Sequence, residues 1–193
     1  MNILVTTDTH FGYAGKEEGI ERPLDFSERI MKHLQLNLTD DSVLLHLGDV
    51  CYDNDEMWHN ALRTLPGKKW LVLGNHDKRT FNWYMEHGWD FVGDSISLQA
   101  FGMNILFSHM PMITDVSTMN EKSFVTYKYD INIHGHFHNF TLEKIKLHEM
   151  HLYNRLNKKH FLISLENLNF MPISLKRVIA LFKAGKRHSV IGA

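Results

Sequence analysis

The chain has 193 residues, enough for one domain with a large buried core, and its 21 Lys and Arg nearly balance its 22 Asp and Glu. This balance argues against a broad basic surface for non-specific nucleic-acid binding. The single cysteine, Cys51, excludes an internal disulfide and a thiolate-rich zinc site. Because the sequence contains neither a signal peptide nor an apolar run of about 18 residues, we expect one cytoplasmic domain over 1–193 with no membrane contact.

Short apolar runs alternate with helical patterns along the first two thirds of the chain. Strands are expected at 2–6, 42–47, 69–73, 103–107 and 131–133. Helices are expected between them at 27–38, 54–65 and 79–87. This order predicts a layered α/β fold with a largely parallel central sheet. Runs that could add a second sheet and a closing helix lie at 90–92, 95–98, 161–165 and 174–182.

The segment 142–159 has apolar spacing that is only partly helical, and we leave its structure open.

Metal-capable side chains follow each of the five expected strands. The sequences are DTH at 8–10, GD at 48–49, GNHD at 74–77, SHMP at 108–111 and HGHFH at 134–138. Ligands of open α/β sheets bind beyond the carboxyl ends of the strands, so these groups are expected to meet. One such sequence alone is weak evidence, but five sequences that each follow a strand predict a metal site.

The donors in these sequences are carboxylates, an amide and imidazoles, without sulfur. Mixed oxygen and nitrogen donors suit divalent Mn, Fe, Zn or Ni. There are more of these donors than a single ion can bind while it keeps one coordination position open for catalysis. Two ions that share a carboxylate fit better, and paired ions are the arrangement that stabilises phosphoryl transfer.

The series DTH, GD, GNHD, SHMP and GHFH resembles the five-part signature of the calcineurin-like metallophosphoesterases, in the correct order over residues 1–140. With RPLDFSE and FMPISL, the whole chain is also similar to small bacterial and phage phosphoesterases of that superfamily. The resemblance implies a four-layer α-β-β-α sandwich with two sheets between helices.

The resemblance also implies two metal sites that share one bridging carboxylate, Asp49. The first site would comprise Asp8, His10, Asp49 and His138. The second would comprise Asp49, Asn75, His109 and His136. His76 would lie beside the substrate as the acid that assists the leaving group. Gly135 would allow a tight turn between the histidines.

Several residues near these motifs have less definite roles. His134 falls outside the ligand pattern, and we expect it to pack or to support a ligand through a hydrogen bond. Tyr52 stands where related protein phosphatases have an Asp that pairs with the catalytic His, so Asp53 or Asp77 could replace that partner. Arg22 is interpreted as a solvated loop charge rather than a phosphate contact.

These inferences predict a two-metal-dependent phosphoester hydrolase, in which a metal-activated hydroxide attacks phosphorus. The substrate is expected to be a small phosphodiester or a nucleotide, and the metal Mn before Fe, Ni or Zn. The alternatives are a nuclease and a catalytically silent metal-binding interaction module. The oligomeric state is left open.

Overall fold

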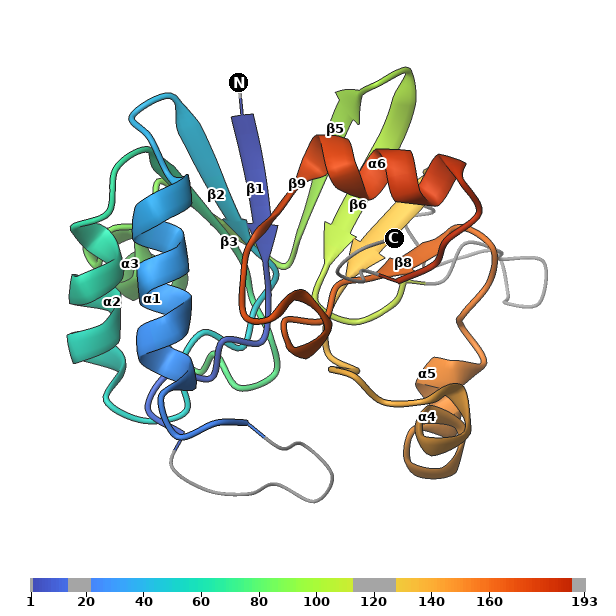
Figure 1. Ribbon diagram of the computed structural model, residues 1–193, viewed down its shortest axis with the longest axis horizontal. Coiled ribbons are helices and arrows are strands. Elements are labelled where there is room, and N and C mark those ends of the chain that lie inside the picture. Colours follow the sequence, from blue (N-terminus) through green and yellow to red (C-terminus); the bar gives the residue numbers. More distant parts are fainter. Residues whose placement is uncertain (1, 14–21, 113–127, 189–193) are drawn as a thin grey trace.

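The computed structural model describes residues 2–13, 22–112 and 128–188, which form two β-sheets flanked by helices (Figure 1). The first sheet has the strand order β4-β3-β2-β1-β9, with bounds Phe91–Gly93, Lys68–Val72, Ser42–His46, Asn2–Thr6 and Ile173–Ser174. The second has the order β5-β6-β7-β8, with bounds Ser95–Ala100, Met103–Ser108, Ile131–His134 and His160–Leu162. The expected α/β fold with two sheets between helices is confirmed.

The prediction of a single central sheet for the five main strands is wrong for two of them. β6 and β7 pair in parallel with each other and belong to the second sheet, whereas the run at 90–92 forms β4 and extends the first. Only Asp94 separates β4 from β5, so the chain changes sheets within one residue. Apolar alternation along the sequence indicates strands but does not indicate which strands pair.

Alternating residues of the first sheet face two different cores. Ile3 and Val5 of β1 pack into the core between the sheets, together with Phe107 of β6. Leu4 and Leu44 point to the opposite face, where the helices lie. This alternation follows from the period of two in an extended strand.

Three helices cover that outer face of the first sheet (Figure 1). Their bounds are Phe26–Asn37 for α1, Asp55–Arg63 for α2 and Phe81–Glu86 for α3. α1 buries Phe26, Ile30 and Leu34, whose spacing of four residues places them on one helix face. The helical patterns predicted for this half of the chain are confirmed.

The remaining helices belong to the last third of the chain. The undecided segment forms α4 (Leu142–His148) and α5 (Met150–Tyr153), which are broken at Glu149. A short 3-10 helix at Glu166–Leu168 precedes α6 (Leu175–Lys183), the expected closing helix. Among all described helices, none is long and apolar enough to cross a membrane.

Five strands bring their carboxyl ends to one end of the two-sheet structure (Figure 1). β1, β2 and β3 run parallel in the first sheet, and β6 and β7 run parallel in the second. The segments that follow these strands are joined by backbone hydrogen bonds, for example from Asp8 N–H to the carbonyl of Gly48 at 2.9 Å. The chemistry-bearing sequences therefore meet at this end.

Candidate metal centre

Two groups of His and Asp side chains lie at this end of the fold, each with potential ligand atoms within 4.8 Å of one another. One group is Asp8, His10 and His138, and the other is Asp49, His109 and His136. Asp8, His10 and Asp49 follow strands of the first sheet, whereas His109, His136 and His138 follow β6 or β7 of the second, so that each group draws on both sheets. The packing of the two sheets therefore assembles both groups.

Asp49 lies between the two groups. Its Oδ2 atom is 3.6 Å from Nε2 of His10 and 3.3 Å from Nε2 of His109. The Oδ1 atom of Asn75 is 2.9 Å from the same His109 nitrogen. The residues predicted as ligands are thus brought together, with Asp49 placed where a bridging carboxylate could contact two ions. Their roles as metal ligands stay predictions.

Five of these side chains project from backbone in the left-handed region. The φ angles are 50° for Asp8, 41° for His10, 57° for Asp49, 72° for His136 and 50° for His138. Residues other than glycine rarely adopt such angles, and they persist at functional sites where the surrounding structure enforces them. The backbone therefore accepts strain at the positions from which these side chains converge.

Gly135 begins the expected tight turn, in which Phe137 N–H donates to the Gly135 carbonyl at 3.0 Å, and it also provides space for a close contact. Its φ angle is not in the left-handed region. A Cβ atom at this position would clash with Oγ1 of Thr7 and with the carboxylate of Asp8. Because Gly135 has no side chain, the segment after β7 can approach the segment after β1. This close approach brings His138 next to Asp8 and His10.

Two histidines of the second group are oriented by hydrogen bonds on the far side of the ring. Nδ1 of His109 lies 2.8 Å from the carbonyl oxygen of Leu47, so this nitrogen donates and Nε2 faces Asp49. Nε2 of His136 lies 2.9 Å from Oε2 of Glu149, which leaves Nδ1 facing His109 at 3.2 Å. Metal ligands commonly have such partners, which fix ring orientation.

Arg22 and Glu166 support the first group in a similar way. Oε1 of Glu166 lies 3.1 Å from Nδ1 of His138 and accepts a hydrogen bond of 2.7 Å from Nη2 of Arg22. The same Arg22 nitrogen donates to the backbone carbonyl of Asp8 at 2.7 Å, and the Arg22 side chain is only 3% exposed. The interpretation of Arg22 as a solvated loop charge is wrong.

Sequence reasoning did not identify Glu149 or Glu166. Both lie beyond the five motifs, in segments without a recognisable pattern of ligands. Their contacts depend on how α4, α5 and the 3-10 helix fold back onto the site, which residue spacing alone does not reveal.

The electrostatics of the site keep its carboxylates ionised. Burial alone would raise the pKa of Asp8, but the nearby His138 and His109 outweigh burial and lower it. The pKa of Asp49 is also lowered, because the hydrogen bond and charge of His109 outweigh its burial. Burial lowers the pKa of His10 to about 4, so that ring is neutral at physiological pH. His109 differs from His10, because burial alone would lower its pKa but its hydrogen bond with Asp49 outweighs burial and raises the pKa to about 9 in the metal-free site. Since ionised carboxylates and neutral imidazoles bind metal, binding at His109 would release a proton.

The chemistry of the site suits divalent metal ions. Nε2 of His10 is buried and has no hydrogen-bond partner among the described residues, although it faces Asp49. A cation bound between this nitrogen and the Asp49 carboxylate would accept the lone pair of the nitrogen and attract the negative charge of the carboxylate. Oxygen and imidazole donors are typical ligands of Mn, Fe, Ni and Zn.

His76 lies next to the first group. Its backbone N–H donates to Oδ1 of Asp49 at 2.8 Å. Its ring centroid is 5.2 Å from that of His10 and 6.4 Å from that of Tyr52, which is 51% exposed. The side chain is thus at the edge of the site, as predicted, beside an aromatic ring that faces solvent. Its role as an acid stays a prediction.

Asp77 has a structural role rather than a contact with His76. Its carboxylate accepts hydrogen bonds from the backbone N–H groups of Asp49, Val50 and Gly74, at 2.8, 3.0 and 2.8 Å. Among the described residues, no hydrogen bond or ion pair joins it to the His76 ring. These bonds instead tie the loop after β2 to the loop after β3, and they hold Asp49 in place.

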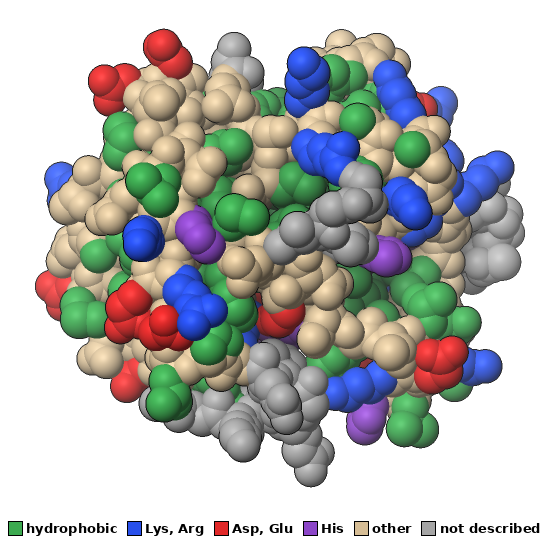
Figure 2. All heavy atoms as spheres, in the orientation of Figure 1, with side chains coloured by type: hydrophobic (Ala, Val, Ile, Leu, Met, Phe, Trp, Pro, Cys, Tyr) green, Lys and Arg blue, Asp and Glu red, His purple; other side chains and the backbone are tan. Residues whose placement is uncertain are grey.

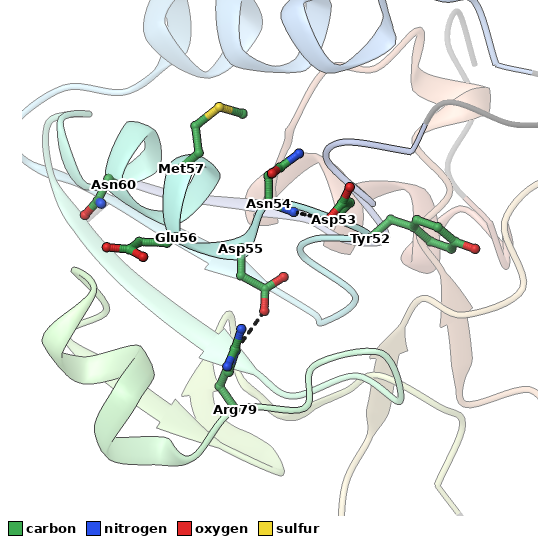
Figure 3. Close-up of a pocket in the computed structure, with 8 residues that line it drawn as sticks. All are labelled: Tyr52, Asp53, Asn54, Asp55, Glu56, Met57, Asn60 and Arg79. Carbon is green, nitrogen blue, oxygen red and sulfur yellow. Dashed lines mark hydrogen bonds and ion pairs between the residues drawn. The ribbon is translucent and has the colours of Figure 1, made fainter.

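Two adjoining pockets open beside His76. One of about 570 Å³ is lined by His76, Tyr52, Lys78 and Arg79, with Cys51 and Asp55. The other, of about 630 Å³, shares Tyr52, Asp55 and Arg79 and continues along the start of α2 (Figure 3). Nε of Arg79 donates to Oδ2 of Asp55 at 3.0 Å, and both residues line the two pockets (Figure 3). The surroundings of His76 are therefore polar and open to solvent.

Residues 1–155 match the sequence profile of the calcineurin-like phosphoesterase superfamily domain. An uncharacterized protein of Methanocaldococcus jannaschii, MJ1445, is 26% identical over 194 residues, which cover 95% of this chain and 93% of that protein. The crystal structure of AQ665 from Aquifex aeolicus, described as a protein of unknown function, has a TM-score of 0.64 and 25% identity and covers 93% of this chain and 98% of its own.

A novel archaeal phosphodiesterase has a lower TM-score of 0.44 at 21% identity, with 73% of this chain and 76% of that chain covered. The profile match spans most of the chain and includes the segments that carry all eight predicted site residues. This protein therefore belongs to the calcineurin-like phosphoesterase superfamily.

Proposed function

We propose that this protein is a two-metal phosphoester hydrolase, most suited to a small phosphodiester or a nucleotide. The observation that carries this proposal is the position of Asp49 between two His and Asp groups, 3.6 Å from His10 and 3.3 Å from His109. Membership of the superfamily supports the same reaction class.

Bound divalent ions would supply an activated water and would neutralise charge on the phosphoryl oxygens. The protein itself orients the site through Glu149 and Glu166, which contact His136 and His138. His76 is assigned the role of donating a proton to the leaving oxygen, because its ring lies beside His10 and lines an open pocket. Positioned acids of this kind act by hydrogen bonding to the group that departs.

The pocket at His76 favours a polar leaving group. Lys78 and Arg79 line it and could contact a phosphate or the hydroxyls of a sugar. Asp55 partly neutralises Arg79, so the pocket is not strongly cationic. A small phosphodiester or nucleotide fits this mixture better than a long polyanion.

A nuclease is the second candidate, and one observation favours it. Basic side chains gather over α6 and the turn after it (Figure 2), namely the exposed Lys176, Arg177, Lys183, Lys186 and Arg187. No acidic residue follows Glu166 in the sequence. This local basic surface could hold a nucleic-acid backbone despite the net charge of -1. A silent interaction module is less favoured, because all predicted ligands are present and grouped.

The native metal is proposed to be Mn, with Fe, Ni or Zn as alternatives. Imidazoles of His10, His109, His136 and His138 suit these ions better than Mg²⁺, which prefers oxygen ligands and retains its water.

The proposal is tested by removing metal with a chelator and assaying a panel of phosphoesters after adding Mn, Ni, Zn or Mg. The panel includes nitrophenyl mono- and diesters, nucleotides, cyclic nucleotides and single-stranded DNA and RNA. We expect no activity in chelator and recovery with Mn or Ni above that with Mg. Hydrolysis of nucleic acid alone would favour the nuclease. Inactivity on every substrate with every metal, in protein that binds metal, would favour the silent module.

A further inference from the structure

A separate cavity of about 830 Å³ lies beneath α4 and α5. Its walls come from the loop after β7, from both short helices, from β8 and from residues that follow α6. Phe137, Phe140, Ile145 and Leu156 provide much of its apolar lining. Pockets for small molecules have this character, since they are largely apolar with a few polar groups and have volumes of roughly 300–1,000 Å³.

The packing beneath α4 and α5 leaves this space open. The buried apolar cluster between these helices and the second sheet comprises Phe137, Ile145 and Leu152 among the described residues. By contrast, the clusters on the two faces of the first sheet are much larger. Folding therefore leaves apolar side chains around a cavity that residues 2–13, 22–112 and 128–188 do not fill.

His134 adds a polar group to the wall of the cavity. It is 1% exposed, and its Nδ1 lies 3.0 Å from the carbonyl oxygen of Gly135, so Nδ1 carries the hydrogen. Nε2 of the neutral ring is then a hydrogen-bond acceptor, and it has no partner among the described residues. An unsatisfied buried polar atom is costly unless something binds it. The metal centre described above does not account for it.

The neighbouring His160, also in the wall, does not supply that partner. Its Nδ1 accepts from the backbone N–H of Asn157 at 3.0 Å, and its Nε2 donates to the carbonyl of Met112 at 2.9 Å. Both of its nitrogens are therefore occupied, and its ring meets that of His134 edge to face at 5.6 Å. Within the described part of the chain, Nε2 of His134 is therefore left available for a donor from a bound molecule.

The cavity adjoins the metal centre through His138. This residue lines the cavity and also belongs to the group with Asp8 and His10. A molecule that extends past His138 could thus place one end in the cavity and the other at the metal centre. Asn139 and Asn154 lie in the same wall and offer amide groups that could contact the edge of a polar ring.

We propose that this cavity binds the heteroaromatic base of a nucleotide-class phosphodiester, with an N–H group of the base donating a hydrogen bond to Nε2 of His134. Apolar walls with a buried acceptor and nearby amides match a flat, uncharged ring with donors at its edge. The inference rests on the proposed function for the identity of the attached phosphoester, but base binding itself needs neither metal nor turnover.

Binding is measured on metal-free protein with adenosine, guanosine, cytidine and uridine, which lack phosphate, by ligand-observed NMR and calorimetry. Leu156→Trp fills the cavity, and Leu142→Trp narrows it at an exposed residue of α4 where folding is not at risk. Leu147→Trp adds the same ring to α4 at a residue outside the cavity lining that is 78% exposed, and serves as the control. His134→Leu removes the acceptor but keeps an apolar side chain.

We expect at least one nucleoside to bind the wild type and Leu147→Trp equally, and to bind Leu156→Trp or Leu142→Trp at least tenfold more weakly. His134→Leu should weaken binding severalfold. With Mn restored, KM for the matching nucleotide diester should rise in the cavity variants, whereas hydrolysis of methyl nitrophenyl phosphate, which has no base, should not change.

Failure of all four nucleosides to bind, or equal binding by the control and cavity variants, would overturn the inference. Nucleoside binding by a protein that hydrolyses no phosphoester would support the cavity site and would reject the proposed function. The two proposals can therefore fail separately.

Discussion

Asp49 lies between the two His and Asp groups, and one of its oxygens faces a histidine of each. Asp49→Asn keeps the size of the side chain but removes its charge. Loss of an outer partner already lowers metal affinity roughly 10–100-fold, and loss of the bridging charge should cost at least as much at both sites. We expect calorimetry to show weakened binding of two ions and assays to show no activity. Asp41→Asn, on an exposed residue just before β2 and at the opposite end of that strand, is the control. Two ions bound with wild-type affinity would refute the bridge.

His76 provides a test of the leaving-group assignment. A nitrophenolate departs without a proton, whereas an alkyl or ribose oxygen needs one. His76→Ala should therefore keep both metals and lose roughly 10²–10⁴-fold on an alkyl or nucleotide diester, with a smaller loss on bis-nitrophenyl phosphate. Equal losses on the two substrates would assign His76 to stabilising the phosphoryl group. Loss of metal would make it a ligand.

The site could be anticipated from sequence wherever its residues directly follow strands. The motifs placed Asp8, Asp49, Asn75 and His109 together because strand ends converge by topology. Arg22 was misread, since nothing in its neighbourhood reveals that Glu166, far along the chain, covers it. Contacts across such sequence distances depend on tertiary packing, and one sequence without its fold does not specify them.

At the scale of elements, the strands and the longer helices were predictable because their apolar residues recur with a clear period. Strand partners were not, and the transition from β4 to β5 across Asp94 carries the chain to another sheet without a sequence signal. The segment of α4 and α5 remained undecided because it buries few apolar residues and breaks at Glu149. Short helices with a weak apolar pattern derive their structure from their surroundings.

The break between α4 and α5 positions Glu149 against His136, at 2.9 Å. Glu149→Gln removes the charge that holds this imidazole ring, so affinity for the metal at the second group should fall by roughly 10–100-fold. Glu143→Gln, on an exposed face of α4, is the matched control and should bind metal as the wild type does. Calorimetric titration of Mn into metal-free protein gives the two affinities. Unchanged affinity in Glu149→Gln would mean that the contact does not orient His136.

At the scale of the whole molecule, the end of the chain returns to its beginning. β9 pairs antiparallel with β1, and Glu166 lies next to Arg22 and His138. The site is thus built from the first, middle and last parts of the chain, so its formation requires the complete fold. The buried charges of the site should therefore contribute to the free energy of unfolding of the metal-free protein.

Glu166 makes this coupling measurable. Burial would raise its pKa, but His138 and Arg22 outweigh burial and hold the pKa well below its ordinary value of 4.5. A carboxyl whose pKa is lower in the folded state stabilises the fold above its unfolded pKa, and this stabilisation is lost as pH falls. Each unit of depression corresponds to about 1.4 kcal/mol.

Chemical unfolding of metal-free protein in chelator should therefore show the free energy of unfolding falling as pH is lowered from about 5.5 to about 3.5, a range that brackets the ordinary glutamate pKa. Asp8 and Asp49 contribute in the same direction, because their pKa values are also lowered.

The contribution of Glu166 is therefore measured as the difference in the free energy of unfolding between the wild type and Glu166→Gln, whose glutamine does not titrate. That difference should shrink as pH falls, because the wild type loses the stabilisation that the variant lacks. Glu143→Gln, on the exposed face of α4, is the matched control for removing a carboxylate away from the site. A constant offset of Glu166→Gln from the wild type would mean that the buried contacts with Arg22 and His138 do not depend on the charge of Glu166.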